Sequence, residues 1–185
     1  AALSPMTSAV FTSKAKTIAV QLATDQLSQI TSLPYTQIIP TTNPQIISSY
    51  LGIPSADVPS EMKNDQGEWS YDDRYFQPHE IPVKMGPKDQ VGTVFHALTF
   101  VELVRPTGSS DPQLMQFDFD SNSSDYGIRR VTAMIFWKAD NGHWKGVRQQ
   151  SLAKNADAML TAKIIGRVFF MDGAITTGIP GARVQ

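Results

Sequence analysis

The residues whose types best suit chemistry stand in one short stretch, "DFDSNSSD", which begins at Asp118. Its alternate oxygen donors, Asp118, Asp120 and Asn122, are ligands of the kind that Ca²⁺ accepts in proteins. An EF-hand loop would also need Gly at its sixth position and Glu at its twelfth, where the sequence has Ser123 and Arg129. The EF-hand is therefore excluded, and a looser calcium site is the one cofactor site that the sequence leaves open.

The simpler interpretation of this stretch is a strand end followed by a surface loop. In "MQFDFD" the two aspartates alternate with Phe117 and Phe119, so they share one face of a strand. Asn, Asp and Ser side chains bond their own backbone in such loops. If a neighbouring subunit buried this face, the aspartates would need a cation or a basic partner such as Arg129 or Arg130. We favour the loop interpretation and expect no catalytic residue here.

Basic residues recur in the second half of the chain, where the sequence predicts strands. Alternation along a strand places some of them on one face, which gives a weak candidate surface for the phosphates of a nucleic acid. The candidates are Arg129, Arg130, Arg148, Lys163 and Arg167. Because the formal net charge is −1 and no three basic residues are consecutive, we do not expect this chain alone to neutralise a packaged nucleic acid.

Other kinds of catalytic or metal site find little support in the sequence. The chain has no cysteine, which excludes disulfides, thiolate metal sites and cysteine nucleophiles. His79, His96 and His143 do not have the spacing of metal ligands, and no Gly-x-Ser-x-Gly motif is present. We therefore expect no catalytic residue and no enzyme.

One aromatic and acidic segment supports an alternative function. Exposed rings stack on the faces of sugars, and paired carboxylates cleave glycosidic bonds. The residues concerned are Trp69, Tyr71, Asp72, Asp73 and Glu80. The competing interpretation is that the rings are buried at one end of the β domain or at an interface between subunits.

The first sixty residues predict a helix followed by an irregular arm. Apolar residues recur three or four positions apart from Ser8 to Ile30, which is typical of an amphipathic helix, and Pro34 follows its end. Such a helix packs on its own domain or, as an exchanged arm, on a neighbouring subunit. Five prolines interrupt residues 32–60, which are too apolar for a solvated linker. We expect residues 1–60 to bury much of their apolar surface outside the β domain of their own chain.

Residues 61–82 are polar, aromatic and rich in loops, with one short strand. From residue 92 onward the pattern changes to short runs of alternating apolar and polar residues, which are typical of strands. The pair Asn141-Gly142 predicts a two-residue type I′ turn between strands near 128–138 and 143–151. The fold class we expect is mainly β. It comprises an antiparallel β-sandwich or jelly-roll-like barrel at 61–185, preceded by an N-terminal helix and an extended proline-rich arm at 1–60.

These features predict a self-assembling structural protein, in particular the subunit of a small viral coat or capsid-type shell. Charged residues make up 18% of the chain, against about 25% in an ordinary soluble protein, which suits a surface covered by copies of itself. Arms that fix neighbours and β domains that tile are parts of closed shells. The expected partners are therefore further copies of the chain, with nucleic acid bound through the weak basic surface.

The expected location is a virion or the host cytoplasm. The beginning of the sequence lacks the pattern of a signal peptide, and no run reaches the roughly 18 apolar residues of a membrane span. The alternative function, carried by the aromatic and acidic segment, is a β-sandwich carbohydrate-binding module or a carbohydrate-active enzyme. Mass in solution separates the two, because a shell subunit assembles and a binding module does not need to.

Overall fold

The computed structural model describes residues 5–64, 67–86, 92–106, 115–118, 125–155, 169–172 and 175–178. The chain divides into two compact units, residues 1–155 and residues 156–185. The second unit contains an antiparallel hairpin of β10 (Phe169–Asp172) and β11 (Ile175–Gly178). All other elements belong to the first unit, which contains every described side chain.

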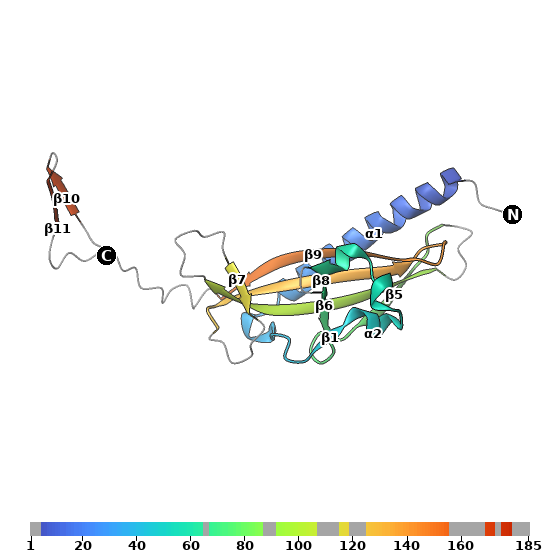
Figure 1. The fold of residues 1–185 in the computed structure, drawn as a ribbon, viewed down its shortest axis with the longest axis horizontal. Coiled ribbons are helices and arrows are strands. Elements are labelled where there is room, and N and C mark those ends of the chain that lie inside the picture. The colour runs from blue at the N-terminus through green and yellow to red at the C-terminus, as the bar shows by residue number, and fades with distance from the viewer. Residues whose placement is uncertain are drawn as a thin grey trace. The chain divides into compact units, whose positions relative to one another are not determined.

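The first unit is built on one antiparallel sheet. Its strands are β5 (His79–Val83), β6 (Thr93–Pro106), β7 (Met115–Asp118), β8 (Ile128–Lys138) and β9 (Trp144–Lys154). The order is β5-β6-β8-β9, and β7 pairs with the far end of β6 on the same side as β5. Figure 1 shows β6, β8 and β9 as three long strands lying side by side. The chain is thus β-rich with antiparallel pairing, as the alternating pattern predicts.

Helix α1 (Pro5–Thr31) covers one face of this sheet. Its buried residues, Ala15, Ala19, Ala23, Leu27 and Ile30, follow the helical period and pack against odd-numbered strand residues. The strand side of this core consists of Phe95, Ala97, Val101, Val131, Ala133, Ile135 and Trp137. The three alanines let the helix axis approach the sheet closely.

The proline-rich segment covers the opposite face. It contains three short 3₁₀ turns, Tyr35–Gln37, Ser55–Asp57 and Ser60–Met62, and the short helix α2 (Ile47–Leu51). Its strands are β1 (Pro44–Ile46), β2 (Lys63–Asn64), β3 (Gly67–Glu68) and β4 (Ser70–Asp72). Strand β1 pairs with β4, and β2 pairs with β3. Ile47, Val58 and Met62 form a second core with even-numbered strand residues. That strand side consists of Leu98, Phe100, Met134 and Phe136.

The described part of the arm therefore packs on the sheet of its own chain. Of the two alternatives for the helix, the structure shows packing on its own domain. The expectation that residues 1–60 bury much of their apolar surface outside that domain is wrong for the described residues. The reason is that β6 and β8 are apolar on both faces, so the sheet needs cover on each side.

The loop between β8 and β9 also differs from the prediction. The last ladder pair is Lys138 opposite Trp144, and Gly142 N–H donates to the Ala139 carbonyl at 2.8 Å. Within this loop only Gly142 has a positive φ, 81°, and Asn141 does not. A type I′ turn needs positive φ at both central residues, so the two-residue turn is wrong. A hydrogen-bonded turn followed by one left-handed glycine fits a three-residue loop, with Asn141 accepting from the His143 N–H at 3.1 Å.

Replacing Gly142 by Val should destabilise the protein by about 1–2 kcal/mol, because a residue with a Cβ resists positive φ. No heavy atom lies within 4 Å of a Cβ built at this position, so the cost is one of backbone conformation and not of a clash. Urea unfolding measures the change. Gly142→Asn is the matched control, since Asn tolerates this conformation, and equal losses in both variants would contradict the assigned turn.

Candidate functional site

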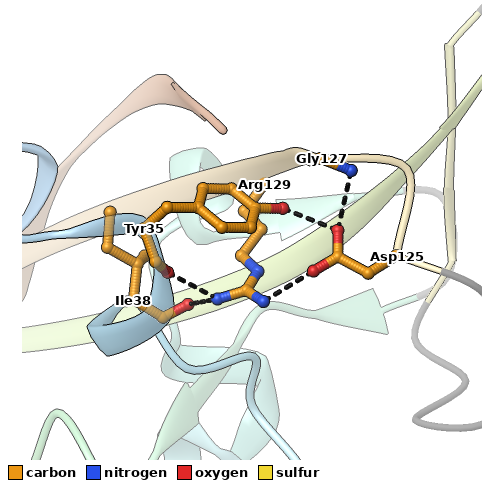
Figure 2. A network of polar contacts seen from close by, with 5 residues as sticks. All are labelled: Tyr35, Ile38, Asp125, Gly127 and Arg129. Atoms are coloured by element: carbon orange, nitrogen blue, oxygen red, sulfur yellow. Dashed lines mark hydrogen bonds and ion pairs between the residues drawn. The ribbon is translucent and has the colours of Figure 1, made fainter. Parts of the chain in front are cut away.

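Arg129 is the centre of a polar network that joins the arm to the sheet (Figure 2). Its Nη1 donates to the backbone carbonyls of Tyr35, at 2.9 Å, and Ile38. Its Nη2 donates to Asp125 Oδ2 at 2.6 Å, and the guanidinium lies 4.1 Å from the centre of the Tyr35 ring. The Tyr35 hydroxyl donates to Asp125 Oδ1 at 2.6 Å, and Gly127 N–H donates to the same oxygen at 2.9 Å. Arg129 thus holds the turn that follows α1.

The electrostatics of this network favour an ionised Asp125. Burial acts to raise the pKa of Asp125, but hydrogen bonds from Tyr35, Arg129 and the Gly127 N–H outweigh it, so the pKa of this carboxyl lies below its usual range. Burial, followed by the hydrogen bond to Asp125, raises the pKa of the Tyr35 hydroxyl. The carboxylate and the neutral phenol therefore persist together at neutral pH. Asp125 is bound by internal donors, which is the role of a structural anchor.

Arg130, the next residue of β8, points to the opposite face of the sheet. It forms a bidentate pair with Glu102, its direct partner on β6, and the Glu102 side chain has no exposed surface. Trp69 lies beside this pair: Arg130 is 5.5 Å and Arg148 is 4.3 Å from its ring centre. Two guanidinium groups thus lie against one indole ring, and one of them binds the carboxylate. Burial and then the charge of Arg130 lower the pKa of Arg148, and Glu102 acts against both.

Of the basic residues that the sequence grouped, the structure brings Arg130 and Arg148 together at Trp69 and places Arg129 elsewhere. Arg129 and Arg130 lie on opposite faces of β8, and each is paired with a carboxylate. Arg148 Nη1 is buried and has no hydrogen-bond partner among the described residues. Lys163 and Arg167 lie outside the described residues. A nucleic-acid surface built from all five stays a prediction.

The predicted calcium ligands are only partly described. Asp118 ends β7, opposite Leu103 of β6, whereas Asp120 and Asn122 lie outside the described residues. Among the residues that the structure describes, no three His, Asp or Glu side chains are grouped to hold a metal ion. Asp125, the last acid of the stretch, is the partner of Arg129. The calcium site therefore stays a prediction from the sequence.

The aromatic and acidic segment is largely buried. Trp69 and Tyr71 are 7% and 8% exposed and belong to the core under α2. Asp72 is buried, and its Oδ1 accepts from the backbone N–H groups of Arg74 and Tyr75 at 2.7 and 2.9 Å, which stabilises a turn. Because the ring faces are covered, this segment offers no open platform to a sugar.

A histidine cluster was missed by the sequence reasoning. The Tyr50 hydroxyl lies 3.3 Å from His96 Nδ1, and the Glu80 carboxylate lies 3.7 Å from the same nitrogen. The Trp144 ring packs edge-on against His96, with the ring centres 5.4 Å apart. These groups come from α2, β5, β6 and β9, so no local spacing could have indicated them. Burial lowers the pKa of His96, although Glu80 acts to raise it, and burial raises the pKa of Tyr50.

The outer side of β6 is covered along its length. Strand β5 pairs with residues 93–97, and β7 pairs with residues 103–106. Between them, Thr41 N–H donates to the Val101 carbonyl at 2.9 Å, and Val101 N–H donates to Thr41 Oγ1 at 3.0 Å. The arm thus fills the gap between the two short strands.

At the opposite edge of the sheet, the outer side of β9 is open as far as the described residues show; this side is called the open edge below. Strand β9 pairs with β8 along its full length, from Trp144 to Lys154, and no described residue pairs with its other side. It is 11 residues long and contains no proline, whereas β5 is 5 residues long and contains Pro82. An uninterrupted edge of this length presents unpaired backbone donors and acceptors to any strand that reaches it. This edge is the candidate functional site, and Arg148 and Trp144 belong to it.

Comparison of the chain with protein-family models, with curated proteins and with solved structures found no match. Among the described residues, no helix has both the length and the apolar character needed to cross a membrane. The residues themselves therefore carry the functional argument.

Replacing Arg129 by Lys should lower the free energy of unfolding by about 2 kcal/mol, because a single ammonium cannot serve two carbonyls and a carboxylate in a fixed geometry. Equilibrium unfolding in urea measures the loss. The matched control is Arg74→Lys at an exposed position, where little change is expected. A loss at Arg129 no larger than that at Arg74 would show that the network does not hold the arm.

The His96 cluster predicts a pH dependence of stability. The unfolded chain binds a proton at the ordinary pKa of 6.5, and the folded chain binds it at a lower pKa. Below pH 6.5 the unfolded state therefore binds more protons than the folded state. The contribution of His96 to stability is complete above pH 6.5 and is lost as the pH drops toward the lower pKa of the folded chain. His96→Gln should flatten this part of a plot of urea midpoint against pH. His143→Gln, at an exposed loop position, should keep the wild-type profile, and a wild-type profile in His96→Gln would refute the assignment.

Proposed function

We propose that this chain is a self-assembling structural protein, the subunit of a closed shell such as a small viral coat. The observation that carries the proposal is the open edge of β9, which is 11 residues long and unpaired on its outer side within the described part of the chain. A soluble protein that works alone usually shortens, bends or interrupts such an edge, because an open edge invites pairing with other chains.

The side chains of β9 favour pairing of its edge with another strand. Lys145 and Lys154 stand near its two ends, and Arg148 is the one charged residue between them. The middle of the strand is therefore neutral at all other positions, and Leu152 is 42% exposed. Arg148 points inward onto the Trp69 ring, and the middle of the strand has no proline or bulge, the other features that protect an edge. The pairing of β8 with β9 runs without a break from Ile128 opposite Lys154 to Lys138 opposite Trp144. Strand β9 therefore has no bulge in this ladder.

The charged groups of the unit point to the same class of function. Glu102 and Asp125 are bound by arginines, and Asp72 is bound by backbone N–H groups. Groups held in this way stabilise a fold and do not transfer protons. No observation favours the carbohydrate alternative, since Trp69 and Tyr71 are buried.

Several expectations belong to the same proposal. They are the binding of nucleic acid through the basic residues, a calcium ion at the loop after β7, and location in a virion or the host cytoplasm. The sandwich or jelly-roll-like arrangement also belongs here, as the finer form of the antiparallel β fold. A structure of the assembled protein would test these together.

The full chain should elute from a sizing column, with light scattering, as a species of many times 20.3 kDa, or as a concentration-dependent series that leads to one. Pairing of backbone edges changes little with salt, so the assembly should persist when ionic strength rises. Electron microscopy of the same fraction should show closed particles. A monomer of constant mass at all concentrations would refute the proposal.

A further inference from the structure

The residues of β9 are suited to antiparallel pairing with a second copy of the same strand. Two copies of an edge strand that pair antiparallel are related by a two-fold axis perpendicular to the sheet, so residues directly opposite each other share a face. Even-numbered residues of β9 then meet even-numbered residues of the second copy, and odd-numbered meet odd-numbered. The two-fold axis must therefore pass beside one residue of the strand, and it cannot pass midway between two consecutive residues.

Charge and the length of paired strand together separate the possible registers. With the axis at Arg148, two arginines would lie directly opposite each other, which is destabilising. With the axis at Gln149, the middle of Trp144–Lys154, the whole strand pairs and no two like charges are opposite. In that register Lys145 faces Ala153, and Arg148 faces Gln150. The ammonium of Lys154 faces the Trp144 ring, a pairing that is attractive in its own right.

Side-chain size agrees with the same register. Leu152 is 42% exposed, although it stands on the face of the sheet that the arm covers. Opposite it in the second copy lies Gly146, which has no side chain to crowd the incoming leucine; an ideal Cβ there would lie 2.7 Å from Met62 Cε. Because Met62 is fully buried, Leu152 of the second copy would lie over Gly146 without reaching Met62. Leu152 would thereby lose part of its exposure to water.

We propose that the open edge binds a second copy of this chain, by antiparallel pairing of β9 with β9 about a two-fold axis at Gln149. The inference rests on the proposed function and gives it one defined contact. The two sheets become one continuous sheet, and both α1 helices lie on the same face of it. The contact is closed by its symmetry, so larger assemblies need a second contact elsewhere on the subunit.

Cysteine cross-linking tests the register directly, because the full chain has no cysteine of its own. In Gln149→Cys the two new thiols would lie directly opposite each other, with Cβ atoms about 4.5–5.5 Å apart, within reach of a disulfide after a small adjustment. Mild oxidation of the full chain should give a covalent dimer. Thr42→Cys is the matched control. Thr42 is exposed and lies next to Thr41, at the edge of the sheet opposite to β9, so this variant should give little dimer.

A mixture of two variants adds a check that does not depend on Gln149. Arg148→Cys mixed with Gln150→Cys should cross-link to the mixed dimer, and each variant alone should do so less well. Circular dichroism of every variant establishes that the fold is kept. Dimer from Thr42→Cys in the same yield as from Gln149→Cys would overturn the inference, because the cross-link would then report collision only.

Hydrogen exchange of the full chain distinguishes the other occupants of the edge. The inference requires that amide protection of residues 145–153 rises with protein concentration. Protection that is independent of concentration, together with no cross-link, would assign the edge to another segment of the same chain and overturn the inference. Large particles on the sizing column without a Gln149→Cys dimer would overturn this register and leave the proposed function standing. A constant monomer without the dimer would overturn both.

Discussion

The antiparallel pairing of β6 with β8, from Phe95 opposite Trp137 to Leu103 opposite Arg129, is the constraint on which the rest of the first unit depends. Both strands are buried on both faces, so their odd- and even-numbered residues face different cores. A slip of one residue in this pairing would turn the odd-numbered residues of one strand away from α1 and the even-numbered residues away from the proline-rich segment. The same alternation sends Arg129 toward Tyr35 and Arg130 toward Glu102. Each arginine therefore reaches its carboxylate only in the observed register.

Much of the fold could be predicted from the sequence because its signals are local. The three-and-four spacing indicated the helix, and the turn pair Asn141-Gly142 with its flanking strands indicated β8 with its observed bounds. The loop at Asn141-Gly142 was found but given the wrong turn type. Dipeptide preference alone does not decide whether one residue or two adopt positive φ. The cover of the sheet by the arm was missed, since it depends on two strands being apolar on both faces.

The candidate site shows the limits of local patterns more sharply. Basic residues were noted as a surface for phosphate, but Arg129 and Arg130 find carboxylates within the fold, one of them 28 positions away. The contacts of His96, which lies on β6, come from three other elements, which no spacing could indicate. Which edge of the sheet is open depends on Thr41 meeting Val101, a contact across 60 positions. These features are set by tertiary pairing and become visible only with the fold.

Helix α1 also bears on the order in which the chain folds. Among the described elements it comes first along the chain, yet the strand that it touches through Thr24 and Gln149 lies 125 positions later. Contacts of such sequence separation slow folding, because the chain must close a long loop before it gains them. Until β6 and β8 exist the helix has no sheet to cover, and its inward face is open to other nascent chains. That face carries Ala15, Ala19 and Ala23 in place of larger residues, so the apolar area exposed during this interval is small, which limits its tendency to aggregate.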